Sequence, residues 1–365
     1  MAGRKSEDLM VEYFAPLNPL PRTNTWGFRY RLLIHLSINP AVPFISVIIT
    51  AHDRTQYLRN AVRSAMIQTL PKNEYEILVV KNFRGGIGET SNQVRIREVL
   101  VDSTPSGTKV CEGVKEAEGE IVSFLDDDDL FLSRKLMKVK EVFAAHENLG
   151  YFKNSFLTWD GRGFHHSPSP RERSEELYVY NDQKRSKFYD LFKWKTYVNS
   201  SSISVRKEVL KRGLDVLKRV NLIVDVFYFY LSLVSQCDIL VSPEVLSLYR
   251  IHGANASIQV GSSWGQLAQR RIDFLKNHLL DIRTIREMID EPPYSRQLDL
   301  DVSIDRITLA ALPVSGVKAH FSDYLDWYRL YAGNWRGRIA GLVAFMPQFV
   351  KRKYAERAYR QRANM

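Results

Sequence analysis

Three short apolar runs stand out in the first half of the chain. They read "FISVII" at 44–49, "YEILVV" at 75–80 and "EIVSFL" at 120–125. Their length and their content of β-branched and aromatic side chains are typical of buried strands. The segments between them are long enough for the crossover that joins two parallel strands. We therefore predict three strands of one parallel sheet.

Helical spacing of apolar positions fills the segments around these strands. It runs through 55–70 until Pro71, recurs at 110–117 before the third strand, and resumes at 136–143. Gly119 is expected at the C-terminal cap of the second helix and Ser133 at the N-terminal cap of the third. Strand alternating with helix predicts an α/β fold with helices on both faces of the sheet.

Two later stretches have other patterns. Residues 160–187 are rich in Gly, Ser, Pro and charge, which predicts a long loop that could act as a lid. The neighbouring His165 and His166 within it are more typical of protein surface than of a pair of ligands. From about residue 262 onward the apolar positions follow helical spacing.

Within that helical region, the stretch 321–335 places aromatic and aliphatic side chains near one face, namely Phe321, Tyr324, Leu325, Tyr328 and Trp335. Basic residues follow at Arg336, Arg338 and 351–353. Two interpretations stay open. The helix could pack on its own domain, or it could lie at a membrane interface with basic side chains facing anionic lipid.

These patterns divide the 365 residues into a basic and aromatic extension at 1–42, an α/β domain at 43–260, and a helical region with a basic amphipathic tail at 261–365. Apolar residues make up 45% and charged residues 25%, as in ordinary globular proteins. No apolar run reaches 18 residues, so we expect no membrane-spanning helix. The N-terminus lacks an uninterrupted apolar core, so we expect no signal peptide. The extension could be a surface anchor or a strap over the C-terminal helices.

The formal net charge of +11 is unevenly distributed, since 351–362 holds six basic residues and one acidic residue. Such a tail fits a solvated end, a membrane-surface contact or a nucleic-acid contact. No nucleic-acid recognition motif accompanies it, so we expect no nucleic-acid partner. Cys111 and Cys237 lack the spacing of a zinc site and favour two reduced thiols in a cytosolic protein.

Four consecutive aspartates, Asp126 to Asp129, directly follow the third predicted strand. Two carboxylates 4 Å apart repel by about 4 kcal/mol at an effective dielectric constant near 20, so this turn needs cations to offset its charge. Ligands of open α/β sheets bind at the carboxyl ends of strands, where Thr50 to Arg54 also lie. Carboxylates suit Mg²⁺ or Mn²⁺, which proteins hold together with substrate phosphates. The cluster therefore predicts a metal-chelated nucleoside diphosphate; an acidic capping turn without metal is the alternative.

The segment "PFISVIITAHDRTQYLRNAV", followed by "GVKEAEGEIVSFLDDDDLFLSRKL", resembles the nucleotide-binding half of family 2 glycosyltransferases. "YVNSSSISVR" at 197–206 and "LSLYRIHGANAS" at 246–257 resemble later motifs of that family, so the resemblance spans roughly 43–257. It implies the GT-A fold, a Rossmann-like sheet flanked by helices that binds nucleotide-diphospho-sugars, here with a helical C-terminal extension. It also implies transfer with inversion.

The resemblance implies a role for each residue of these motifs. Asp128 and Asp126 would bind the metal, Asp126 would also face the ribose, and Asp127 would make supporting contacts in the donor site. His252 would lie near the diphosphate or be a further metal ligand; a hydrogen-bonded structural histidine is the alternative. Asp225, in "LIVDVFYFYLSL", would be the catalytic base, since burial raises a carboxyl pKa and suits it to proton abstraction. A helix N-cap is the alternative for Asp225. The nucleotide pocket would be lined by Thr50, Ala51, His52, Asp53 and Arg54.

Two positions depart from the pattern of the family. Where the family has "VVDDGS", this chain has "VVKNFRG", so Asn82 would meet the base with a different set of donors and acceptors. The Arg-Asn pair that the family carries before the third strand is replaced by Val110 and Cys111. Lys109 or Thr108 would then supply the phosphate contact.

The sequence thus predicts a metal-dependent, inverting hexosyltransferase that uses Mn²⁺ or Mg²⁺ and a UDP- or GDP-linked sugar. The basic and aromatic C-terminal region favours a glycolipid or polyprenyl-linked glycan as acceptor. We expect a cytoplasmic protein, peripheral on the cytoplasmic face of the membrane. A donor-binding but inactive family member and a basic nucleic-acid-binding protein are alternatives. A nucleotidyltransferase-like enzyme is a third, but "TAHDRTQYL" lacks the Gly-rich loop that it needs.

Overall fold

The computed structural model describes residues 43–52, 55–89, 91, 93–160, 163–166, 175–252, 264–331 and 334–363. The extension at 1–42, the site candidates Asp53 and Arg54, and the centre of the expected loop at 160–187 lie outside these ranges. So do the side chains of His165 and His166.

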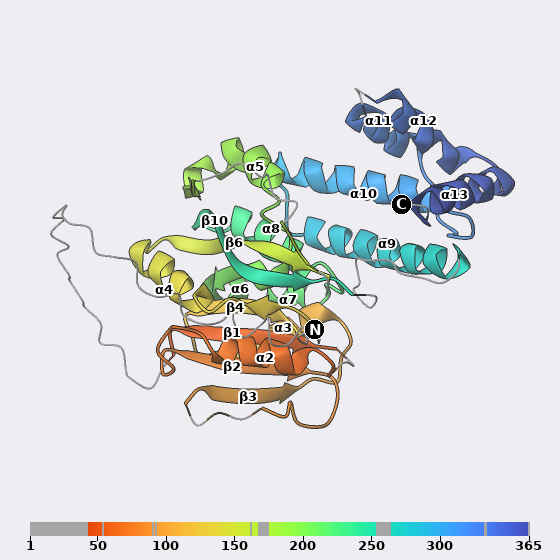
Figure 1. Ribbon diagram of the computed structural model, residues 1–365. Helices are drawn as coiled ribbons and strands as arrows, with labels where there is room; N and C mark the ends of the chain where they lie inside the picture. The colour runs from red at the N-terminus through yellow and green to blue at the C-terminus, as the bar shows by residue number, and fades with distance from the viewer. Residues whose placement is uncertain are drawn as a thin grey trace.

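A ten-stranded sheet forms the centre of the molecule (Figure 1). Its strand order is β3-β2-β1-β4-β9-β6-β10-β5, with β7 paired to β6 and β8 to β10. The strands are β1 Ile45–Ala51, β2 Tyr75–Lys81, β3 Arg95–Leu100, β4 Ile121–Asp126, β5 Leu130–Phe131, β6 Leu149–Trp159, β7 Phe164–His166, β8 Leu177–Val179, β9 Ile203–Arg206 and β10 Asp238–Arg250. The first four are parallel, and β9 runs antiparallel to its neighbours β4 and β6. The three predicted strands are therefore confirmed as β1, β2 and β4.

Helices cover both faces of the sheet, as predicted. One face packs against α2 Leu58–Met66 and α4 Lys135–Ala145. The other packs against α3 Ser106–Glu116, α5 Lys184–Lys193, α6 Lys207–Lys211, α7 Leu214–Leu217 and α8 Val224–Val234. In β1, Val47 and Ile49 join the first core, whereas Ile48 between them joins the second. Burial on both faces explains why these strands are almost continuously apolar in sequence.

Several local predictions were wrong. The helix expected over 55–70 is shorter, and α4 has Arg134 rather than Ser133 at its N-cap. Helix α3 ends at Glu116 with Ala117 as its C-cap, so Gly119 caps nothing. A Cβ at Gly119 would lie 2.5 Å from the backbone nitrogen of Ser46, so this position is glycine because strand β1 passes too close. The expected loop at 160–187 contains β7, β8, the 3-10 turn η1 Asn181–Gln183 and the start of α5.

The C-terminal region is helical, as predicted. Long helices α9 Trp264–Arg286 and α10 Tyr294–Ala311 lie side by side and carry the remaining helices at their far end (Figure 1). These are α11 Phe321–Leu330, α12 Trp335–Leu342, the 3-10 turn η3 Val343–Phe345 and α13 Gln348–Ala363. Ile282, Ile285 and Leu298 share the apolar core that contains α8, so α9 and α10 are packed onto the sheet domain. Among the described residues, no helix is both long enough and apolar enough to cross a bilayer.

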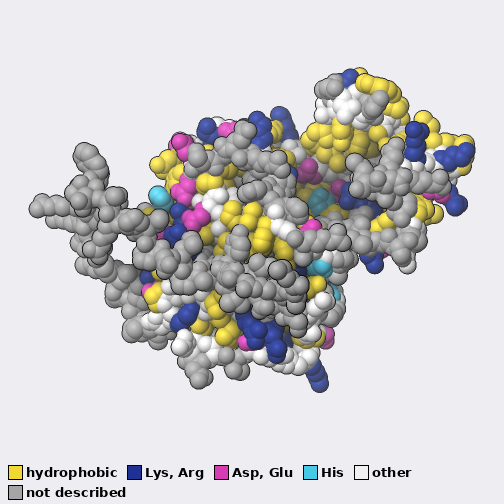
Figure 2. Space-filling view, viewed as in Figure 1, with side chains coloured by type: hydrophobic (Ala, Val, Ile, Leu, Met, Phe, Trp, Pro, Cys, Tyr) yellow, Lys and Arg dark blue, Asp and Glu magenta, His cyan; other side chains and the backbone are white. Residues whose placement is uncertain are grey.

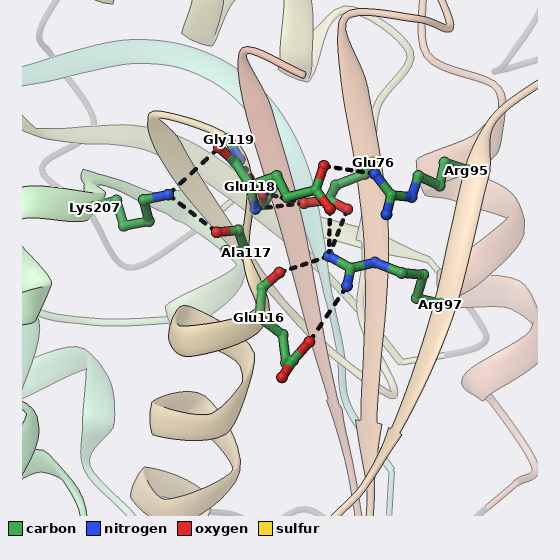
Figure 3. A network of polar contacts seen from close by, with 9 residues as sticks. Glu76, Arg95, Arg97, Glu116, Ala117, Glu118, Gly119 and Lys207 are labelled. Atoms are coloured by element: carbon green, nitrogen blue, oxygen red, sulfur yellow. Dashed lines mark hydrogen bonds and ion pairs between the residues drawn. The ribbon is translucent and has the colours of Figure 1, made fainter. Parts of the chain in front are cut away.

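A dense ionic network lies at the amino ends of the parallel strands (Figure 3). Glu76, wholly buried near the start of β2, accepts hydrogen bonds from Ser46 Oγ at 2.7 Å and from the backbone N–H of Glu118 at 2.8 Å. Arg97 Nη2 lies 2.9 Å from the second oxygen of Glu76. Arg95 pairs with Glu118 at 2.6 Å on the more exposed side. This network joins β1, β2 and β3 to the loop before β4.

Candidate active site

The opposite edge of the sheet holds the predicted site. Thr50 near the end of β1 pairs with Asp126 at the end of β4, so both strands finish at the same level. A cavity of about 450 Å³ opens there. Its walls include the predicted residues Thr50, His52, Lys109, Asp126, Asp127, Asp128 and Asp225. Phe274 also lines it, which brings α9 of the C-terminal region to the same cavity.

The four aspartates form a tight turn between β4 and β5. The backbone N–H of Asp129 donates to the carbonyl oxygen of Asp126 at 3.2 Å, which closes the turn. Asp127 Oδ2 accepts from the backbone N–H of His52 at 3.1 Å, and so connects the turn to the end of β1. Asp129 is fully buried and accepts from the backbone N–H of Arg250 at 3.0 Å. Asp129 therefore shapes the turn, whereas Asp126, Asp127 and Asp128 border the cavity.

Asp128 is held against the end of β10. Its Oδ2 lies 3.0 Å from His252 Nε2, and its carbonyl oxygen accepts from Arg250 Nε at 2.9 Å. The Arg250 guanidinium is stacked between the rings of Tyr57 and Trp159, 4.5 Å from each centroid. These contacts fix the Asp128–His252 pair at the cavity wall, although the two residues are 124 positions apart.

The turn is rich in negative charge that the protein itself offsets only in part. Burial raises the pKa of Asp126 well above its usual range, and the charges of Asp129, Asp128 and Asp127 raise it further. Burial raises the pKa of Asp129 in the same direction, while hydrogen bonds from Ser201 and Arg250 oppose the shift. Two neighbouring carboxyl groups with raised pKa values would be stabilised in their ionised form by a bound cation, which makes this turn a candidate cation site.

The donor set suits a divalent cation only when the substrate contributes ligands. Asp128 and His252 provide a carboxylate oxygen and an imidazole nitrogen 3.0 Å apart, and Asp126 lines the same cavity. Within the described ranges, no three His, Cys, Asp or Glu residues are grouped closely enough to hold one ion. Phosphate oxygens usually complete such coordination shells, so the two-residue arrangement remains compatible with Mg²⁺ or Mn²⁺.

Asp225 lies across the cavity, in the first turn of α8. The N-cap of this helix is Ile223, so Asp225 is not the capping residue. Its Oδ2 accepts from the backbone N–H of Asn199 at 2.9 Å and its Oδ1 from that of Val226 at 3.0 Å. Burial raises the pKa of the Asp225 carboxyl, and these hydrogen bonds and the charge of Lys153 act in the opposite direction. Because its pKa is raised by burial, this carboxylate is a stronger proton acceptor than an exposed aspartate.

A polar turn that carries no predicted role connects the two carboxylate groups. It comprises Asn199 and the 3-10 turn η2 Ser200–Ser202. Asn199 has a φ of 70°, and its side chain accepts from the backbone N–H of Ser201 at 2.9 Å. The Ser201 hydroxyl in turn accepts from the backbone N–H of Asp126 at 3.0 Å. The sequence signal for this turn is the run "NSSS" between apolar residues, which is polar yet almost wholly buried.

Lys109 and Thr108 have different surroundings. Lys109 is 1% exposed, lines the cavity, and its Nζ donates to the carbonyl oxygen of Thr104 at 2.8 Å. The Thr108 hydroxyl donates to the carbonyl oxygen of Lys218 at 3.0 Å. Of these two candidates for a phosphate contact, the structure places Lys109 at the cavity and Thr108 against α7.

Two other predicted pocket residues do not line this cavity. The side chain of Ala51 is fully buried in the core between β1 and α2, so only its backbone can face a ligand. Asn82 is half-buried just after β2, to the side of the cavity. The site as described is therefore centred on the ends of β1 and β4 and the start of α8.

Comparison with known proteins identifies the sequence relationship. Residues 46–214 match Glycosyl transferase family 2. An uncharacterized glycosyltransferase of Nostoc sp. is 25% identical over 228 residues, which cover 60% of this chain and 68% of that relative. Glycosyltransferase AglE of Haloferax volcanii is 31% identical over 94 residues, or 24% of this chain and 31% of the relative. The match to AglE is thus limited to under a third of its length.

Solved structures share the fold. TarS 1–349 of Staphylococcus aureus, in complex with UDP, superposes with a TM-score of 0.53 at 16% sequence identity. The match covers 87% of this chain and 91% of the TarS chain. The same TarS fragment in complex with UDP-GlcNAc gives a TM-score of 0.51 at 15% identity. The predicted fold, a GT-A-like sheet flanked by helices with a helical C-terminal region, is confirmed.

Proposed function

We propose that this chain, whose residues 46–214 match Glycosyl transferase family 2, transfers a hexosyl group from a UDP- or GDP-linked sugar to a hydroxyl acceptor, with inversion at the anomeric carbon. One observation carries this proposal. A single cavity brings the Asp126–Asp128 turn and the isolated carboxylate of Asp225 together. The first suits the diphosphate of a donor, and the second suits the removal of a proton from an acceptor. The UDP-GlcNAc bound to TarS supports a uridine nucleotide as the first donor to test.

The reaction is a single displacement. The acceptor oxygen forms a bond to the anomeric carbon while the bond from that carbon to the phosphate oxygen breaks. The acceptor proton passes to the Asp225 carboxylate, and the nucleoside diphosphate leaves with the bonding electron pair. Main-chain N–H groups hold Asp225 at 2.9 and 3.0 Å and leave lone pairs on both oxygens for this proton. Burial raises the pKa of Asp225, which makes it a stronger base than an exposed carboxylate.

Asp128 and His252, with Asp126, would hold Mn²⁺ or Mg²⁺ together with the donor. When bound, the ion offsets the charge that develops on the leaving diphosphate. Lys109, buried at the cavity wall, would contact the phosphates of the donor. Asp127 contributes by holding the turn against His52, 3.1 Å away.

Donor binding tests this proposal most directly. We expect UDP- or GDP-sugars to raise the melting temperature in the presence of Mn²⁺, since a ligand that binds only the folded state stabilises it by RT ln(1 + [L]/Kd). Asp128→Ala should abolish the Mn²⁺-dependent part of the shift. Glu244→Ala, which removes an acidic side chain away from the cavity, should keep it. If no nucleotide sugar stabilises the protein with or without metal, the proposed donor class is wrong.

The C-terminal helices support a peripheral contact with anionic membrane, where a glycolipid or polyprenyl-linked acceptor would reside. Phe321, Trp335 and Phe349, from three different helices, are 66–68% exposed. Figure 2 shows hydrophobic side chains gathered on this lobe with Lys and Arg side chains beside them. Single exposed apolar residues are normal, but a gathered set rimmed by positive charge is the pattern of an interfacial surface.

The same helices also contribute to a core of their own. Tyr324 and Trp327 pack with Ala344 against α10, so only part of the aromatic stripe faces outward. Deleting the region would therefore expose this core and is a poor test. The better variant replaces the exposed Phe321, Trp335 and Phe349 by serine. We expect the wild type to float with anionic liposomes at low salt and more weakly at high salt. The triple variant should lose the salt-resistant part; absence of flotation at low salt would contradict the proposed membrane contact.

A further inference from the structure

Lys153 is a buried amine directly beneath the candidate active site. It lies on β6 and is 4% exposed, with its Nζ 4.9 Å from the ring centroid of Phe156. The Nζ contacts the hydroxyl of Ser202 and donates to the carbonyl oxygen of Asn154 at 3.3 Å. Across the described ranges, no carboxylate lies within ion-pair distance of it. A buried amine without a paired counter-ion is costly, so its position calls for a reason.

A short chain of hydrogen bonds connects this amine to the proposed base. The Ser202 hydroxyl, which accepts from Lys153, donates to the carbonyl oxygen of Asn199 at 2.7 Å. The backbone N–H of the same Asn199 donates to Asp225 Oδ2 at 2.9 Å. Both polar groups of the Asn199 main chain are thus engaged, one toward Lys153 and one toward Asp225.

The link is built on a backbone conformation that must be held in place. Asn199 has a φ of 70°, in the left-handed region that residues other than glycine rarely adopt. Its side chain secures one side of the turn by accepting from the backbone N–H of Ser201 at 2.9 Å. The Lys153–Ser202 contact secures the other side. The backbone N–H of Ser202 also donates to the Asn199 carbonyl at 3.1 Å, so loss of the Lys153 contact would loosen this side of the turn, and with it the N–H that orients Asp225, without unfolding it.

The positive charge of Lys153 favours the ionised form of Asp225, as do the hydrogen bonds that Asp225 accepts. Groups from several elements interact with Asp225: Asp126 on β4, Tyr151 and Lys153 on β6, Tyr197 before η2, and Tyr228 on α8. Burial raises the pKa of each tyrosine, which keeps it neutral, and Asp126 is an acid. Among these groups, Lys153 is the basic one, and it interacts with the charge of Asp225. A second buried lysine, Lys135, lies close enough to Lys153 for their charges to repel.

We propose that Lys153 is a positioning residue for Asp225, acting from inside the protein through the Ser202 hydroxyl and the Asn199 turn. The inference rests on the proposed role of Asp225 as base. Lys153 does not touch the cavity and has no contact with substrate; it sets the orientation and the ionisation of the residue that does. Burial lowers the pKa of Lys153 to about 7 and the Asp225 charge opposes that shift, so the two groups favour each other's charged forms.

Lys153→Met and Lys153→Arg test this role through the pH dependence of kcat. Removing the positive charge raises the pKa of Asp225, so a smaller fraction of the base is ionised at acidic pH. We expect the acidic limb of the pH profile of kcat to move to higher pH by ~1 pH unit in Lys153→Met. This corresponds to about a tenfold lower kcat on that limb, with recovery at alkaline pH and a donor KM within about twofold. Lys153→Arg should restore the limb, because it keeps the charge.

Lys184→Met is the matched control. Lys184 is also buried, and its Nζ bonds only to main-chain oxygens of Ser232 and Ser235 at the far end of α8. It should change the melting temperature without moving the pH profile. If Lys153→Met does not fold, Lys153→Gln removes the charge while keeping a donor toward Ser202, and the same upward shift is expected.

Two outcomes would overturn the proposal: an acidic limb that stays in place in the neutral variants, or an equal loss of kcat at every pH together with loss of donor affinity. The second would make Lys153 purely structural. A separate readout covers failure of the proposed function. If the wild type transfers no sugar, carboxyl ¹³C titration still compares the pKa of Asp225 in wild type and Lys153→Met, and equal values would refute the coupling.

Discussion

Carboxylates lie at both ends of the parallel strands, but the two groups differ in how far other groups of the protein compensate their charge. At the amino ends, Glu76 has no exposed surface, yet Ser46, Arg97 and the backbone N–H of Glu118 all donate to it (Figure 3). At the carboxyl ends, Asp126 and Asp129 lie beside further aspartates, and burial and mutual repulsion raise their pKa values.

The difference separates a structural from a functional use of the same chemistry. A buried acid whose oxygens accept hydrogen bonds from the protein holds neighbouring strands together and needs no ligand. An acidic cluster at a cavity wall whose members Asp126 and Asp129 have raised pKa values is stabilised when a cation or a proton binds. The sheet thus holds its paired charges at one edge and the proposed ligand site at the other.

The largest expected effect is on catalysis at the carboxyl edge. Asp225→Asn removes the proposed base but keeps an oxygen acceptor for the backbone N–H of Asn199. We expect kcat to fall by about 10²-fold or more while the donor dissociation constant stays within a few-fold. Glu118→Gln at the amino edge is the control and should leave both values unchanged. Equal loss of donor binding in Asp225→Asn would make this residue structural.

Next in size is a loss of stability at the amino edge. Glu76→Gln keeps the shape of the side chain but removes the buried charged partner of Arg97 at 2.9 Å, so Arg97 keeps only the more exposed Glu116 and Glu118, and it places an NH₂ among donors. We expect the free energy of unfolding to fall by about 2–4 kcal/mol, measured by urea denaturation. The kcat of the folded fraction should not change. A variant as stable as wild type would show that the network adds little to the fold.

A smaller effect of opposite sign is expected for Asp126→Asn in EDTA. The pKa of Asp126 is raised in the folded state, so its ionisation costs stability once the pH exceeds its unfolded pKa near 4. Wild type should therefore lose stability relative to Asp126→Asn as the pH rises from 5 to 8. We expect the variant to melt about one to two degrees higher at pH 8, since ~1 kcal/mol shifts Tm by roughly 1–2 °C in a chain of this size. Identical differences at both pH values would contradict the assigned shift.

The smallest effect is expected at the exposed part of the amino edge. Arg95 and Glu118 are 2.6 Å apart, but both side chains are more than a third exposed. Arg95→Gln should cost under about 1 kcal/mol, and less in high salt, because solvent screens the pair. The difference between the stability losses of Arg95→Gln and Glu76→Gln measures how much burial strengthens an arginine–glutamate pair. A loss as large for Arg95→Gln would mean that the whole network acts as one unit.

Local pattern determined much of this molecule. Six-residue apolar runs predicted β1, β2 and β4, because a strand buried on both faces has to be apolar along its length. The position of Asp126–Asp129 directly after such a run predicted a ligand edge, because parallel strands end together. The resemblance to the family's motif pointed to Asp225, and its place as a single acid between apolar runs supported that choice. Each of these inferences needed only a few neighbouring residues.

What only the tertiary structure decided are the contacts between segments distant in sequence. Ser201 meets Asp126 across 75 positions, and His252 meets Asp128 across 124. Lys153 is one of several polar residues in β6, beside Asn154 and Ser155, and its buried contact with Ser202 connects it to Asp225. The capping role assigned to Gly119 failed for the same reason, since a neighbouring strand rather than the helix end requires glycine there. Periodicity reports which side chains are buried, whereas the identity of the partner that meets a buried polar group depends on how the chain is brought together.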